Sequence, residues 1–159
     1  MSFSLTRKTD YALVALAALG REKNGNGQPL SARWIAEAYD LPLPILMNAL
    51  KELHRAEIVC SRRGAGGGYY LCREPAQITI REVIEAIEGP VNVTLCSDDP
   101  REHHAGADVS GCQLAHQCPI SDPMQRFNNL LQGFLARMTL ESLTACRPNM
   151  TIPPTGVSV

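Results

Sequence analysis

Aromatic residues and long apolar segments are scarce in this sequence. Its 159 residues include 1 Trp, 4 Tyr and 3 Phe, so a core must be built mainly from Leu, Ile, Val and Ala. No apolar run approaches the about 18 residues that a bilayer-spanning helix needs. The apolar segment 12–19 follows Arg7, Lys8 and Asp10, and no small-residue cleavage site comes after it. We therefore expect no signal peptide, no membrane partner and a cytoplasmic protein.

Common enzyme motifs are absent as well. The sequence contains no Gly-rich phosphate loop, no nucleophile elbow and no metal-hydrolase helix. These absences predict a protein that is not an enzyme. With 45% apolar and 19% charged residues, the chain should fold as a globule rather than remain disordered.

Charge is distributed unevenly along the chain. Residues 1–73 hold 10 Lys/Arg against 6 Asp/Glu, a net +4, whereas residues 74–159 hold 5 against 10, a net −5; together these give the overall −1. A basic front half favours contact with a polyanion such as DNA, and an acidic back half favours a different role.

The front half predicts a helix-turn-helix. Helical spacing of apolar residues indicates a helix over 5–19, with Thr6 or Thr9 as N-cap, and the Gly/Asn-rich segment 20–29 reads as a loop. Ser31 is a suitable N-cap for a helix over 32–39. After the break at 40–42, Pro44 fits the first turn of a helix that runs to about residue 55. An ordinary helical hairpin is the alternative.

The segment that follows predicts a β-hairpin with a basic tip. Residues 57–61 and 69–72 read as strands around the tip sequence RRGAGGG at 62–68. Glycine permits positive φ and close backbone approach. Arg62 and Arg63 on a narrow tip suit a DNA minor groove; a solvated basic turn is the alternative.

The back half predicts two more helices and a loop. Thr79 caps a helix over 80–88 that ends at Gly89-Pro90, and the loop 96–118 separates it from a long helix over 123–143. Because the apolar stripe of this last helix is wide, we expect it to form a dimer interface rather than to pack only on its own domain.

These elements predict a mainly α fold with a small β-hairpin wing: a winged helix-turn-helix plus a long dimerisation helix. The expected organisation is a DNA-binding domain over 1–90, a cysteine-rich loop over 91–121, a dimerisation helix over 122–147 and a flexible tail over 148–159.

The chain contains six cysteines, at positions 60, 72, 96, 112, 118 and 146. In a cytoplasmic chain they favour metal ligation, sensing or core packing over structural disulfides, and we expect Cys60 and Cys72 to be packing residues of the wing strands. Cys96, Cys112 and Cys118 lie in the polar loop and favour an iron–sulfur cluster. A zinc site of three cysteines with a histidine and three unliganded thiols are the alternatives.

The helix LPILMNALKELHRAEIV, the hairpin RRGAGGGYYLCREP, the segment ITIREVIEAIEG and the trailing cysteines resemble the Rrf-type family of bacterial iron–sulfur winged-helix transcriptional regulators (IscR/NsrR/RirA-like), over about residues 3–145. The resemblance implies a homodimer on a roughly palindromic double-stranded DNA operator. It also implies cluster ligation by Cys96, Cys112 and Cys118, with 4Fe-4S favoured and 2Fe-2S possible.

The resemblance also suggests how DNA is contacted. Arg63 matches the family's minor-groove arginine, whereas Pro42, Pro44 and Met47 replace polar base-contacting residues, and Glu57 stands where the family usually has Gly. Asn48 and Lys51 then become candidates for base or phosphate contact. The full set of expected DNA-contacting residues is Ser31, Arg33, Pro44, Asn48, Lys51, Arg55, Arg62 and Arg63.

The fourth cluster ligand stays open at this point. Some members use a His three positions after the last cysteine, but this chain has Ser121 there. Others use an Asp in the first helix of the partner subunit, and Asp10 matches that position. We favour Asp10 over a loop histidine at 103, 104 or 116.

The sequence therefore predicts a DNA-binding regulator whose operator affinity is switched by a cluster that senses nitric oxide, redox state or iron–sulfur status. The alternative is a winged-helix regulator in which bare thiols, for instance Cys112 and Cys118, form a disulfide redox switch without a cluster.

Overall fold

The computed structural model describes residues 5–24, 28–64, 66–93 and 118–145. The expectations for the cysteine loop, including Cys96, Cys112, His103, His104 and His116, and for Cys146 and the tail lie outside these residues.

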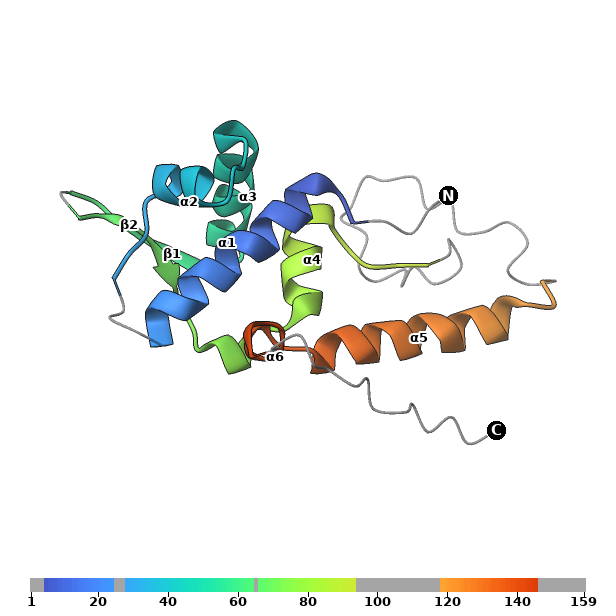
Figure 1. Cartoon of the computed structure of the whole chain (residues 1–159). Coiled ribbons are helices and arrows are strands. Elements are labelled where there is room, and N and C mark those ends of the chain that lie inside the picture. Colours follow the sequence, from blue (N-terminus) through green and yellow to red (C-terminus); the bar gives the residue numbers. More distant parts are fainter. Residues whose placement is uncertain (1–4, 25–27, 65, 94–117, 146–159) are drawn as a thin grey trace.

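The described part of the chain is mainly helical with one antiparallel hairpin, which confirms the predicted fold class (Figure 1). The elements in chain order are α1 Arg7–Asn24, α2 Ala32–Ala38, α3 Leu43–Arg55, β1 Val59–Arg62, β2 Gly68–Leu71, a 3-10 turn Pro75–Gln77, α4 Ile80–Glu88, α5 Ser121–Arg137 and α6 Leu140–Thr144. No helix in these residues is long and apolar enough to cross a membrane.

Helix α1 lies at the centre of the fold and contacts α3, α4, α6 and β2. Its buried face carries small and aliphatic side chains, among them Ala12, Ala15 and Leu16, which are fully buried. They pack with Leu50 and Leu53 of α3 in one aliphatic core, as the shortage of aromatic residues predicts.

Helix α1 is longer than the sequence predicts. It continues through Gly20 to Asn24, so the expected loop is wrong for residues 20–24. Gly20 is buried against Leu71, Pro75 and Leu140, and the good helix formers that follow it continue the helix. A helix tolerates an interior glycine at a cost of about 1 kcal/mol.

Four helix boundaries in the middle of the chain are confirmed. The Ser31 hydroxyl accepts a hydrogen bond from the Trp34 N–H at 3.1 Å, which caps α2. Pro44 stands in the first turn of α3. Thr79 caps α4 in a capping box with Glu82, and Gly89 ends it with φ +86°.

The predicted last helix is two helices. Helix α5 ends at Arg137, and Thr139 starts α6 with its own capping box to Ser142. Backbone bonds from the Ile80 N–H to Met138 O and from the Leu140 N–H to Ile78 O, both 2.8 Å, bind this junction to the start of α4. The break brings the chain back to the core, where Leu140 is buried.

Candidate nucleic-acid interface and cluster ligands

Helix α3 has one apolar and one polar face. Its buried residues are Leu46, Ala49, Leu50 and Leu53, while Ile45 is exposed. The DNA candidates of this helix, Pro44, Asn48, Lys51 and Arg55, are all exposed. Their spacing of three or four residues aligns them on one face, opposite the core, and α3 can therefore enter a major groove.

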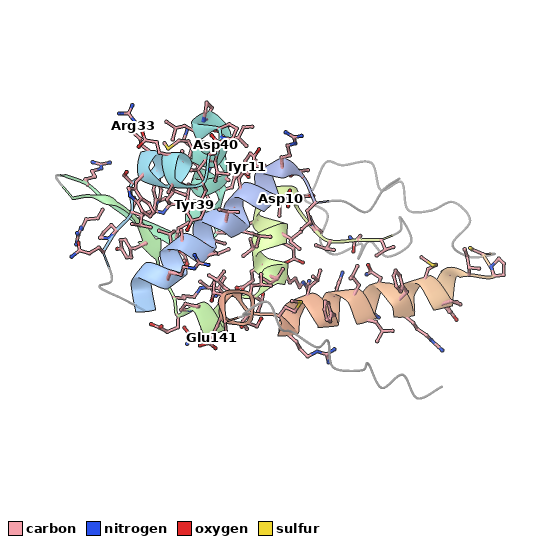
Figure 2. All side chains as sticks on the ribbon, viewed as in Figure 1. Asp10, Tyr11, Arg33, Tyr39, Asp40 and Glu141 are labelled. Atoms are coloured by element: carbon pink, nitrogen blue, oxygen red, sulfur yellow. A yellow bond between two sulfur atoms is a disulfide. The ribbon has the colours of Figure 1, made fainter. Side chains whose placement is uncertain are left out.

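Helix α2 precedes this face and carries two of the expected contact residues. Ser31 and Arg33 are exposed, and Figure 2 shows the Arg33 side chain pointing away from the body. Trp34, the one tryptophan of the chain, is 48% exposed.

The wing tip has the backbone that its glycines predict. Gly64 and Gly66 have φ of +102° and +76°, which L-residues adopt at a cost. Arg62 and Arg63 are exposed there, and the Arg62 guanidinium donates to Gly66 O at 3.3 Å. The tip projects beyond α2 (Figure 1), as expected of a wing that reaches a neighbouring groove.

The wing is attached to the segment that leads into α2. Leu30 and Tyr69 exchange backbone hydrogen bonds of 2.9 and 2.8 Å. The approach requires glycine beside it, because a Cβ added at Gly68 would lie 2.4 Å from Leu30 O. The orientation of the wing relative to α2 is thereby fixed by backbone contacts.

Asp10 is exposed on the N-terminal part of α1 (Figure 2), and no hydrogen bond or ion pair of its side chain occurs among the described residues. Its neighbours connect α1 to two other helices. Lys8 Nζ lies 2.7 Å from Glu52 Oε2 on α3. The buried Thr9 hydroxyl donates to Glu88 of α4.

Glu88 stabilises the start of α1. Its carboxylate also accepts the Thr6 N–H at 2.8 Å, ahead of the first helical turn. Burial raises the pKa of Glu88, but the hydrogen bonds from Thr9 and Thr6 and the charge of Lys8 outweigh burial and leave the pKa below its ordinary value. The carboxylate is thus held ionised at the positive end of the α1 dipole.

Cys118 is a free, half-buried thiol just before α5. No group of three or more His, Cys, Asp or Glu that could hold a metal occurs in the described ranges, which leave out Cys96 and Cys112. Thiolate and carboxylate are both iron ligands, and Cys118 and Asp10 each have their ligand atoms available. The N-terminal end of α5 projects away from the body that carries α1 (Figure 1).

Cys60 and Cys72 are not simple packing residues, which corrects the prediction made from their alternation in the strands. They form a disulfide with a Cα–Cα distance of 5.3 Å, inside the range that a disulfide spans. Cys60 pairs with Tyr70 in the hairpin ladder, so the bond joins diagonal positions on one face. Alternation places both cysteines on that face, but only the register and twist bring them together.

Comparison with known proteins assigns the chain to a family. Residues 5–146 match Rrf2, described as iron-dependent transcriptional regulator. The chain is 30% identical over 145 residues to a helix-turn-helix transcriptional regulator of Neisseria meningitidis, covering 91% of this chain and 90% of that protein. It is 30% identical over 139 residues to the regulator IscR of Escherichia coli, covering 87% and 78%.

A solved structure agrees in fold and sequence. CymR, the global cysteine regulator of Bacillus subtilis, superimposes with a TM-score of 0.66 at 28% identity, covering 91% of this chain and 98% of that one. The family match spans the helix-turn-helix, the wing and the last two helices together. The chain belongs to the Rrf2 family of transcriptional regulators.

Proposed function

We propose that the protein binds duplex operator DNA through α3 and the wing, and that an iron–sulfur cluster adjusts this binding. The observation that supports DNA contact most strongly is that α3 exposes a polar face and the wing that follows it exposes two arginines. Asn48 and Lys51 face outward from α3, Arg62 ends β1, and Arg63 begins the tip. In this arrangement α3 reads a major groove while Arg63 enters the adjacent minor groove.

A homodimer presents two such surfaces to DNA. Helix α5 exposes Phe127, Leu130 and Phe134, which are 50%, 71% and 49% exposed and share one face. The opposite face is already occupied, because Asn128 accepts the Val93 N–H and Gln132 donates to Val91 O. The exposed stripe is therefore free to meet a second copy, and two-fold symmetry favours a roughly palindromic operator.

The cluster is assigned to Cys96, Cys112 and Cys118, with Asp10 of the partner subunit as the fourth ligand. The free thiol of Cys118 and the exposed carboxylate of Asp10 support this ligand set. Within one chain, the start of α5 lies away from α1 (Figure 1), so a ligand from the partner subunit fits better than one from the same chain. When bound, the cluster supplies iron–thiolate bonds that nitric oxide or oxidants can modify.

Helix α1 connects the proposed ligand to the DNA-reading helix. Asp10 lies two residues from Lys8, and Lys8 forms the ion pair with Glu52 on α3. The Lys8 charge also balances a carboxylate oxygen that is otherwise buried without a hydrogen bond. A force on Asp10 is therefore transmitted to α3 through packed side chains rather than through a loop.

Anaerobic purification with absorbance, iron and sulfide analysis tests the ligand set. We expect a coloured wild-type protein, and loss of the cluster in Cys112→Ala and Asp10→Ala. Cys146→Ala and Asp40→Asn are the controls and should retain it; Asp40 has φ +52°, which Asn adopts readily. An intact cluster in both test variants contradicts the ligands. A colourless wild type after iron and sulfide supply favours the disulfide switch at Cys112 and Cys118.

Fluorescence anisotropy with duplex DNA tests the interface. Arg63→Ala should weaken binding and lower the slope of log affinity against log salt by about one. Arg137→Ala removes another exposed arginine, at the C-terminal end of α5, and should leave both unchanged. Equal effects of the two substitutions would show that net charge, and not the wing, determines DNA affinity.

A further inference from the structure

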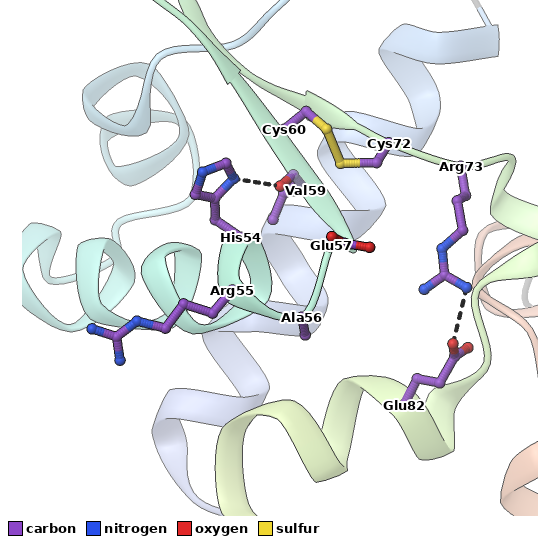
Figure 3. A pocket seen from close by; sticks show the side chains of 9 residues that line it. All are labelled: His54, Arg55, Ala56, Glu57, Val59, Cys60, Cys72, Arg73 and Glu82. Atoms are coloured by element: carbon purple, nitrogen blue, oxygen red, sulfur yellow. Dashed lines mark hydrogen bonds and ion pairs between the residues drawn. A yellow bond between two sulfur atoms is a disulfide. The ribbon is translucent and has the colours of Figure 1, made fainter.

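The Cys60–Cys72 disulfide occupies a position from which it can control the wing. It closes the open end of the hairpin, where β1 follows α3 and β2 leads toward α4 (Figure 3). The Cys72 N–H donates to Ile58 O at 3.1 Å, so the bond lies at the last rung before the strands separate. Both cysteines are half-buried and both line a surface pocket, which gives small reagents a route to the pair.

The surroundings of the pair are polar and open. The disulfide lines a surface pocket with residues of three elements (Figure 3). Arg55 and Glu57 are exposed at its edge, while Arg73 is joined to Glu82 at 2.9 Å and His54 Nδ1 lies 2.8 Å from Val59 O. A buried structural disulfide would lack such access.

The hairpin does not need the covalent bond to form. Four residue pairs make up its ladder, from Val59 with Leu71 to Arg62 with Gly68, and Val59 and Leu71 are buried in the core. If the protein acts on chromosomal DNA, as proposed above, it works where thiols are kept reduced, and disulfides there are mostly transient and redox-sensing. The Cys60–Cys72 bond is thus better explained as the oxidised state of a redox pair than as a permanent support of the hairpin.

We propose that Cys60 and Cys72 are a reversible thiol–disulfide exchange site whose oxidised form clamps the wing for DNA binding. The oxidant is a low-molecular-weight disulfide. One cysteine thiolate attacks it, forming a mixed disulfide and releasing one small thiolate. The second cysteine thiolate attacks the protein sulfur of that mixed disulfide and releases the other. The protein gives two electrons and two protons, and the oxidant becomes two small thiols.

The clamp acts on DNA affinity through Arg62, which is two residues from Cys60. In the oxidised form the wing is fixed at both strands and at the Leu30–Tyr69 bridge. In the reduced form the wing must lose more conformational freedom on docking, and such ordering lowers affinity. We expect the oxidised form to bind duplex DNA about 3- to 10-fold more tightly.

Two complementary full-length variants test the site. Cys96→Ser/Cys112→Ser/Cys118→Ser/Cys146→Ser retains only the pair, and Cys60→Ser/Cys72→Ser lacks only the pair. Each is equilibrated in mixtures of reduced and oxidised glutathione, quenched in acid and alkylated, and its intact mass is then measured by mass spectrometry. The first variant should lose both alkylatable thiols reversibly as the mixture becomes more oxidising. Adding Cys72→Ser to the first variant leaves Cys60 as its single cysteine, which should accumulate the mixed disulfide.

The same samples are titrated with a random-sequence duplex of about 30 base pairs at low salt, where phosphate contacts dominate. The pair-only variant should bind more tightly when oxidised, whereas adding Cys60→Ser/Cys72→Ser to that variant leaves no cysteine and should make binding equal in all mixtures. Thiols that stay reduced, or a disulfide that never opens, would overturn the exchange site. Equal affinity of both redox forms would overturn the clamp. If no form binds duplex, the proposed function fails, and the mass measurement still decides whether the pair exchanges.

Discussion

Glu57 occupies a backbone conformation that its side chain does not favour. It lies in the turn between α3 and β1 with φ +56°, where a β-carbon costs about 1–2 kcal/mol and glycine avoids that cost. The resembling family usually has Gly at this position, and the positive φ supplies the physical reason.

Replacing this residue should therefore stabilise the protein. Glu57→Gly removes the β-carbon but adds backbone freedom to the unfolded chain, worth about 0.5–1 kcal/mol. We expect the free energy of unfolding to rise by about 0.5–1 kcal/mol, measured by urea denaturation. Glu57→Ala retains the β-carbon and should give no gain. Equal stabilisation by both would assign the effect to the lost charge instead of φ.

Glu88 makes stability depend on pH. Its pKa in the folded protein lies below the ordinary 4.5, so its contribution is present above pH 4.5 and is lost as pH falls through the folded pKa. Because the side chain is exposed, we expect Glu88→Gln to cost only about 0.3–1 kcal/mol at neutral pH. Thermal melts should show the difference from wild type shrinking below pH 4.5. A gap that stays constant down to pH 3 would contradict this origin.

Among the elements, those with strong local signals were predictable from sequence. Ser31 and Thr79 gave the starts of α2 and α4 correctly, because capping depends on residues within one turn. The predicted end of α1 was wrong, and the break between α5 and α6 was not predicted. Both depend on long-range contacts, namely the packing of Gly20 against Leu140 and the bridge between Thr79 and Thr139.

The candidate site likewise has features that local sequence predicts and features that depend on long-range contacts. The exposed DNA candidates follow from helical spacing and from the glycines of the tip, which are local features. The Cys60–Cys72 bond depends on strand register and twist, which spacing does not reveal. The ligand role of Asp10 rests on a second subunit and stays a prediction.

The wing should also be sensitive to a single methyl group. Gly68→Ala places a Cβ 2.4 Å from Leu30 O, and the backbone of Leu30 and Ser31 leaves no room for it. We expect the Leu30–Tyr69 bridge to open and DNA affinity to fall at least about 10-fold, as lost phosphate and groove contacts imply. Gly20→Ala is the matched control: its nearest contacts are 3.9 Å, and alanine favours the helix. Unchanged affinity in Gly68→Ala would show that the bridge does not position the wing.

At the scale of the whole molecule, α5 determines whether the DNA-binding surfaces of two copies act together. Leu130 is 71% exposed in the centre of its apolar stripe, between Phe127 and Phe134. Burying a leucine contributes about 1.5–3 kcal/mol, and a two-fold interface buries it in both copies. Leu130→Glu removes both contributions and also places two carboxylates in the interface. We expect the dimer dissociation constant to rise at least about 100-fold, measured by sedimentation equilibrium.

Asn129→Glu introduces the same charge one residue away, on another exposed part of the helix surface, and should leave the dimer intact. DNA binding distinguishes the consequences further. Because both half-sites of a palindrome must be engaged together, Leu130→Glu should reduce affinity for a two-half-site duplex far more than for a single half-site. If Leu130→Glu remains dimeric, the apolar stripe of α5 is not the contact between copies. The dimer that would bring Asp10 of the partner subunit to the iron–sulfur cluster would then lose its support.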